Sequence, residues 1–225
     1  MAHDRQATAV PDGAAMVERL WAKDPTLWSV DKDKRDSIQK RLGWLAAPAW
    51  LGAHIDELRE RVSNIRALNW QRVVLLGMGG SSLAPAVLAQ IAATGSTGSR
   101  FEILDSTHPD TVRRAMAHED PANTLFLVSS KSGTTLEVMA LWSYFDGLLR
   151  ADAAAANGSS RNFVAITDAG TPLEALARER GFLDCFVNPP DVGGRFRHSP
   201  TLEWCPRPCW DSILINCWNR LNDKR

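Results

Sequence analysis

The feature that most constrains the fold is an alternation beginning at residue 72, where short apolar runs take turns with segments of helical period. Unbroken apolar runs are typical of strands that are buried on both faces of a sheet. Because a helix follows each run and such crossovers are right-handed, the pattern predicts an α/β fold with a doubly wound, Rossmann-like parallel sheet of about five strands. The predicted strands are residues 72–77, 101–105, 124–130, 162–168 and 184–188.

Ahead of this alternation, residues 1–70 read as a helical lead-in, because residues 14–22 and 51–68 carry apolar side chains at helical spacing. We expect the lead-in to pack on the sheet domain, which we place at residues 71–196. Residues 197–225 differ in composition and form a separate tail.

Composition and charge narrow the classes of partner. Lys plus Arg and Asp plus Glu both count 26, and no basic block interleaves with aromatic residues, so nucleic acid is not expected as a partner. The best candidate for a membrane span, SLAPAVLAQIAA, is too short and contains a proline. The amino terminus lacks the apolar segment of a secretion signal, so we expect a cytoplasmic protein with no membrane partner.

The first junction with unusual chemistry is LLGMGGSSLAP (residues 75–85), which follows the first predicted strand. Gly77, Gly79 and Gly80 allow a tight turn and the close approach of a ligand, and Ser81 and Ser82 follow at the start of the next helix. Backbone N–H groups and the positive end of the helix dipole favour an anion there. By itself the stretch reads equally well as a tight turn with a serine cap, and it lacks the third glycine of a dinucleotide fingerprint.

The second junction is VSSKSGTTLEV (residues 128–138), between the third predicted strand and its helix. A capping box of Thr134 with Glu137 explains one of its hydroxyl groups, but it does not explain four hydroxyls beside a lysine. The residues concerned are Ser130, Lys131, Ser132, Thr134 and Thr135. Because parallel strands end at one edge of a sheet, we expect the two junctions to converge on one phosphomonoester. Without a Walker lysine motif or a carboxylate cluster, a sugar phosphate is expected rather than a nucleotide with Mg²⁺, and no cofactor or metal is implied.

Three motifs make the resemblance to a known family specific. GMGGSSLAP, SSKSGTT and NPPDVGGRF, in this order and spacing, resemble the sugar isomerase (SIS) domain of the glucose-6-phosphate isomerase family. The lead-in RLWAKDPTLWSVDKDKRDSIQKRLGWL is similar to the segment before that domain in bifunctional transaldolase–phosphoglucose isomerase proteins. The resemblance covers roughly residues 15–196 and implies an SIS fold that interconverts glucose 6-phosphate and fructose 6-phosphate.

The resemblance also implies roles for single residues. Gly80 and Ser81 match the family's substrate contacts in the first loop, and Arg195 matches the arginine that stabilises the anionic enediolate. The phosphate cradle is matched by Ser130, Lys131, Ser132 and Thr135, with Thr134 adding a hydroxyl between them. Members of the family commonly form homodimers.

The family's general base is a glutamate, and a histidine and a lysine assist ring opening; all three lie well after the GGR motif. No residue of this chain matches them, since His54, His108 and His118 fall on predicted helices or turns. We therefore expect a truncated isomerase that carries the phosphate site and has negligible turnover. A non-catalytic SIS module that binds a sugar phosphate as a regulator is the alternative.

The tail allows two further interpretations. Cys205 and Cys209, with Cys217 and His198 nearby, could be drawn as a zinc site of an interaction protein, although no second matched pair of ligands exists. Alternatively, a single-nucleotide frameshift after Phe196 accounts for the tail. Re-read in that frame, the codons for WC, CW and WD must give valine, leucine and glycine, which agrees with FGMVPAALLGFD, the family's continuation. We hypothesise that residues 197–225 are an out-of-frame tail, which the nucleotide sequence around codon 196 would test.

Overall fold

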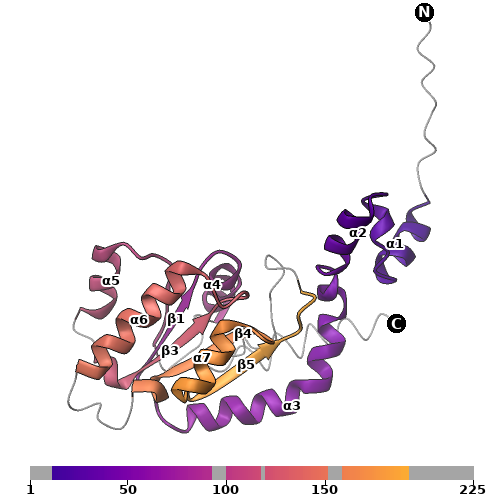
Figure 1. The fold of residues 1–225 in the computed structure, drawn as a ribbon. Coiled ribbons are helices and arrows are strands. Elements are labelled where there is room, and N and C mark those ends of the chain that lie inside the picture. The colour runs from indigo at the N-terminus through magenta and orange to yellow at the C-terminus, as the bar shows by residue number, and fades with distance from the viewer. Residues whose placement is uncertain (1–11, 93–99, 118–119, 152–158, 193–225) are drawn as a thin grey trace, which may run out of the picture.

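A parallel sheet forms the centre of the computed structural model, which describes residues 12–92, 100–117, 120–151 and 159–192 (Figure 1). In the described residues five strands pair in the order β2-β1-β3-β4-β5, and every pair is parallel. The strands are β1 (Arg72–Gly77), β2 (Arg100–Leu104), β3 (Thr124–Ser129), β4 (Phe163–Asp168) and β5 (Asp184–Asn188). The α/β class and the doubly wound sheet predicted from the sequence are confirmed.

The helices lie before the sheet and between its strands. The lead-in holds α1 (Gly13–Trp21), α2 (Lys32–Gln39) and α3 (Ala47–Arg66); the sheet domain holds α4 (Gly80–Ala92), α5 (Pro109–Met116), α6 (Leu136–Ala151) and α7 (Pro172–Arg180). Short 3₁₀ turns occur at Pro25–Leu27, Gly43–Ala46, Pro121–Asn123 and Ser159–Asn162. Of the helices described, none is both long and apolar enough to cross a membrane.

Two apolar layers cover the two faces of the sheet. Helices α5, α6 and α7 pack on one face, where Phe126, Phe145 and Phe163 are fully buried side by side. Helix α3 packs on the other face through Leu58, Val62 and Ile65. Because both faces are covered, β1, β3 and β4 are buried at every position, which explains why their sequences are unbroken apolar runs.

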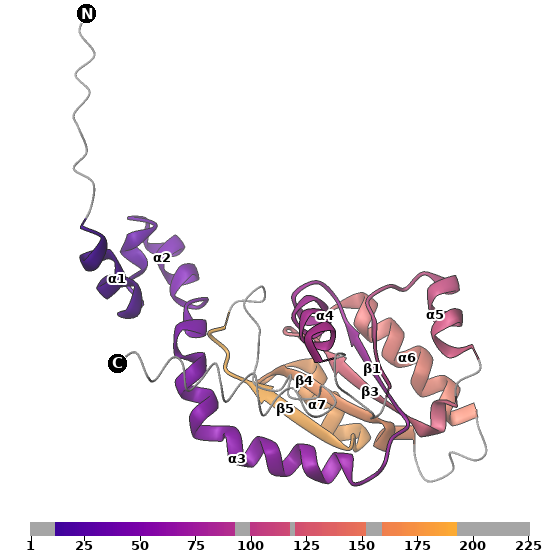
Figure 2. The same cartoon turned by 180° about the vertical axis from the view of Figure 1, so that it is seen from behind.

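The rest of the lead-in takes little part in this core. Helices α1 and α2 contain no buried residue, and Trp21 of α1 is 59% exposed. Figures 1 and 2 both show α1 and α2 beyond the amino-terminal end of α3, away from the sheet. Within the described lead-in, the contribution to the sheet's core therefore comes from α3.

The strand register brings four loops to one edge of the sheet. Gly77 at the end of β1 is opposite Ser129 of β3, and Ser129 is opposite Ile166 of β4. Asp168 at the end of β4 is in turn opposite Asn188 of β5. The loops that follow β1, β3, β4 and β5 therefore leave the sheet side by side.

Candidate functional site

The site lies at the point where the winding of the sheet reverses. The chain goes from β1 to β2 on one side and then returns to β3 on the other side of β1. Ligands of doubly wound proteins bind in the crevice beyond the carboxyl ends of the strands at such a switch point. The two loops that the sequence singled out, after β1 and after β3, are the two that flank this point.

The first loop is a tight turn that leads directly into a helix. Gly79 has a left-handed backbone (φ 56°), and α4 begins at Gly80. The Ser82 hydroxyl donates to the carbonyl of Gly79 (3.0 Å), so this buried serine closes the turn. Gly80 and Ser81 are left at the first turn of α4, where the helix dipole favours an anion.

The second loop contains two hydroxyl pairs. The inner pair joins Ser130 Oγ and Thr135 Oγ1 at 2.8 Å, and Ser130 is almost fully buried. In the outer, exposed pair, the Thr134 hydroxyl donates to Ser132 Oγ at 2.8 Å. Helix α6 begins just after these residues, so its amino terminus and all four hydroxyls lie together.

Gly133 holds this loop against the next one. Its φ of 66° is left-handed, and a Cβ on it would lie 2.6 Å from the backbone nitrogen of Leu173 in α7. Only glycine fits both the backbone conformation and this close approach.

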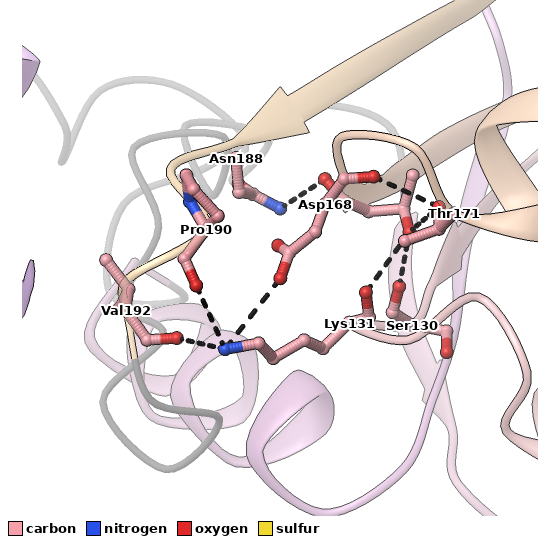
Figure 3. A network of polar contacts seen from close by, with 8 residues as sticks. Ser130, Lys131, Asp168, Thr171, Asn188, Pro190 and Val192 are labelled. Carbon is pink, nitrogen blue, oxygen red and sulfur yellow. Dashed lines mark hydrogen bonds and ion pairs between the residues drawn. The ribbon is translucent and has the colours of Figure 1, made fainter. Parts of the chain in front are cut away.

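Lys131 extends toward the loop that follows β5 (Figure 3). Its ammonium group donates to the carbonyls of Val192 (2.6 Å) and Pro190 (3.5 Å). It also lies 3.7 Å from the carboxylate of Asp168 at the end of β4. The lysine expected in a phosphate cradle therefore also connects three of the four loops.

Buried polar groups on β4 and β5 hold the backbone of the Ser-Lys-Ser loop. Thr167 Oγ1 donates to the carbonyl of Ser130 (2.7 Å) and lies 2.7 Å from the hydroxyl of Thr171. The side-chain amide of Asn188 donates to the carbonyl of Thr167 (3.0 Å). The motif-based prediction missed Thr167, Asp168 and Asn188. The sequence signal that could have indicated them is a polar residue at the end of an otherwise apolar strand.

The predicted residues thus fall into two groups. Gly80, Ser81 and the Ser130–Thr135 loop are brought to the same edge of the sheet. Arg195 lies outside the described residues, as do the four residues considered for a zinc site, which are His198, Cys205, Cys209 and Cys217. Within the described part, no three His, Cys, Asp or Glu side chains gather as a metal site would require.

The sheet order and the polar loops at its switch point define a doubly wound α/β protein with a candidate anion site. A family model described as phosphoglucose isomerase matches residues 53–199. The chain belongs to the phosphoglucose isomerase family.

Curated relatives agree with this assignment. A glucose-6-phosphate isomerase of Thermus thermophilus is 37% identical over 166 residues, covering 72% of this chain and 38% of the relative. That of Geobacter sulfurreducens is 33% identical over 206 residues, covering 88% and 36%. The chain spans a little over a third of the length of these relatives.

Two solved structures share the fold. The hypothetical protein TT0462 from Thermus thermophilus superposes with a TM-score of 0.66 at 32% identity, covering 84% of this chain and 43% of that one. A glucose-6-phosphate isomerase from Chlamydia trachomatis gives a TM-score of 0.55 at 27% identity, covering 79% and 32%.

Proposed function

We propose that this chain supplies the phosphate-binding part of a glucose-6-phosphate isomerase site and binds glucose 6-phosphate or fructose 6-phosphate. The observation that carries the proposal is the placement of two helix amino termini and two hydroxyl-rich loops at the switch point of a sheet in this family. Curated relatives named for this activity support the substrate.

The chemistry of the loops suits a phosphate dianion. The amino terminus of α6 offers backbone N–H groups, and α4 and α6 both add the positive end of a helix dipole. Ser81, Ser130, Ser132, Thr134 and Thr135 add hydroxyl donors, and Lys131 adds positive charge nearby. A hydrogen bond to a charged group contributes about 1.5–3 kcal/mol, so a few of them suffice for measurable affinity.

The isomerisation itself needs more than this site. A base must move a proton between C2 and C1 of the open-chain sugar through an enediolate, and a cation must stabilise the charge that develops. We propose Arg195 for the cation, and no residue of the chain matches the family's base glutamate. The 225-residue chain alone is therefore proposed to bind its ligand without turnover.

The binding test is calorimetric titration with 6-phosphogluconate. Replacing both hydroxyls of the inner pair in Ser130→Ala/Thr135→Val leaves no orphaned partner, and we expect affinity to fall by about tenfold or more. The matched control is Ser143→Ala on the exposed side of α6, which is expected to bind as the parent does. If the parent chain binds neither 6-phosphogluconate nor fructose 6-phosphate, the proposed function is wrong.

A non-catalytic regulatory module is the second candidate, favoured by the missing match for the base. Both candidates predict no turnover by the chain alone, so a coupled assay that follows conversion of fructose 6-phosphate tests this shared expectation. Measurable turnover by the chain alone would rule out the regulatory module and would also contradict the proposed loss of activity.

A further inference from the structure

Lys131, in the loop after β3, holds the segment Pro190–Val192 that follows β5. The ammonium group donates to the carbonyls of Val192 (2.6 Å) and Pro190 (3.5 Å), and Figure 3 shows the side chain reaching across to this segment. Two carbonyl acceptors on one ammonium group fix the distance between the loop after β3 and the loop after β5.

Asp168 sets the direction in which Lys131 points. Its carboxylate lies 3.7 Å from the ammonium nitrogen, and its side chain is only 11% exposed. The backbone N–H of Asp168 also donates to the carbonyl of Lys131 (3.4 Å). A nearly buried carboxylate needs a compensating cation, so the pair holds Lys131 over β4 and toward β5.

The lead-in holds the same segment from the opposite side. The N–H of Gly43 donates to the carbonyl of Asp191 (2.9 Å), Leu42 forms an antiparallel bridge with Val192, and Lys23 pairs with the Asp191 carboxylate at 3.2 Å. A Cβ at Gly43 would lie 2.7 Å from the backbone carbonyl carbon of Asp191, so glycine is needed for this approach. Pro190–Val192 is thus clamped between two elements.

Distance separates this segment from the phosphate. Adjacent strands lie about 4.8 Å apart, so the loop after β5 is roughly 10 Å from the loop after β3 along the sheet. A phosphate at the amino termini of α4 and α6 is therefore too small to contact both loops. A sugar attached to that phosphate is long enough to extend from one loop to the other.

We propose that Lys131 is a positioning residue, directed by Asp168, that fixes Pro190–Val192 so that this segment meets the sugar part of the ligand rather than the phosphate. The inference rests on the proposed function, because it assumes that the ligand is a sugar phosphate. It assigns a role to Asp168, and it gives the contact between lead-in and loop a part in binding.

The test compares two ligands, inorganic phosphate and 6-phosphogluconate, in calorimetric titrations. In Lys131→Met, the affinity for 6-phosphogluconate is expected to fall by about tenfold, while that for inorganic phosphate changes less than about threefold. Asp168→Asn is also expected to lower the affinity for 6-phosphogluconate more than that for inorganic phosphate. Lys131→Arg is expected to restore the affinity for 6-phosphogluconate, because a guanidinium group can also donate to two carbonyls. Lys32→Met on the exposed face of α2 is the control for loss of one positive charge.

An equal loss for both ligands would make Lys131 a direct phosphate ligand and overturn the proposal. No loss for either ligand, or loss of thermal stability alone, would overturn it too.

Hydrogen exchange of the ligand-free chain tests the clamp separately. The amides of Asp191 and Val192 are expected to exchange faster in Lys131→Met and Asp168→Asn, and at the parent rate in Ser130→Ala. Unchanged exchange in Lys131→Met would refute the clamp whether or not the chain binds a sugar phosphate. If the parent chain binds no ligand but the exchange changes as expected, the clamp stands and the sugar-binding role fails together with the proposed function.

Discussion

At the scale of single residues, Gly133 carries the strictest requirement in the described site. Its left-handed backbone and its approach to Leu173 both exclude a side chain. Gly133→Ala is expected to lower the free energy of unfolding by about 2 kcal/mol or more, since left-handed strain and a steric clash add. Urea denaturation followed by circular dichroism measures the loss.

Two other glycines separate the causes of that loss. Gly170 has a φ of 73° but open space around it, so Gly170→Ala reports strain alone. Gly147 lies within α6 with nothing near its would-be Cβ, so Gly147→Ala is expected to stabilise by about 0.5–1 kcal/mol. If Gly133→Ala costs no more than Gly170→Ala, the contact with Leu173 is not a constraint.

The thiol of Cys185 predicts how the stability of the fold depends on pH. Burial, with smaller contributions from the carboxylates of Glu174 and Asp184, raises the pKa of its thiol from 9.0 to about 11. Below pH 9 the thiol is protonated in both states, so stability does not depend on it. Between pH 9 and 11 the unfolded chain loses this proton first, so stability falls as pH rises. Mass spectrometry of iodoacetamide labelling on the Cys185 peptide should show a midpoint near 11. A midpoint near 9 would contradict the burial argument.

At the scale of elements, Arg61 connects α3 to the edge strand β5. Its guanidinium group makes two bonds to the Asp184 carboxylate (2.5 and 3.1 Å), donates to the carbonyl of Cys185 and lies over the ring of Phe186. Arg61→Ala is expected to cost about 1–3 kcal/mol of unfolding free energy, because the pair is partly buried and bidentate. Urea denaturation measures it.

The same helix offers a matched control. Arg59 pairs with Asp56 at 3.6 Å on the exposed face of α3, and Arg59→Ala is expected to change stability by less than about 0.5 kcal/mol. Equal costs for the two arginines would mean that α3 docks through its apolar side chains alone.

The sequence predicts the elements well and their ends less well, for a physical reason. Strands β1 and β5 have the predicted bounds. For β1 the reason is that a strand covered on both faces reads as a nearly continuous apolar run. A capping box of Thr134 with Glu137 would make Thr134 the residue that caps the helix, yet α6 begins only at Leu136, because the hydroxyl pair of Ser132 and Thr134 holds those residues in the loop. Local hydrogen bonds of this kind compete with helix formation and leave little trace in periodicity.

At the scale of the whole molecule, the sequence predicts where the candidate site lies but not how Lys131 points. Glycines and hydroxyls at two strand ends suffice to place both loops at one edge, since sheet topology does the rest. The direction in which the Lys131 side chain points depends on Asp168, at the end of β4, and on Pro190–Val192, which follow β5. These partners lie far along the chain from Lys131, and no local pattern encodes such contacts.

The helices of the lead-in differ in how much they contribute to the core. Among the lead-in residues that the structure describes, those buried in the sheet's core come from α3, whereas α1 and α2 contain none. Segments with little buried apolar surface open at low free energy, so α1 and α2 are expected to open far more often than α3. The stable unit is therefore expected to begin near the start of α3 and not at residue 71, where the sequence placed the domain boundary.

Limited trypsin digestion tests this boundary. The arginines and lysines within α1 and α2 are expected to be cut early, while Arg59, Arg61 and Arg66 of α3 stay uncut in a persistent fragment. Cutting in α3 requires exposure of Leu58, Val62 and Ile65, each worth about 1.5–3 kcal/mol of burial. Mass spectrometry of a digestion time course identifies the cuts, and digestion in urea, where all sites are open, calibrates their intrinsic rates. Equal rates in the two regions under native conditions would place the boundary after α3 and contradict its role in the core.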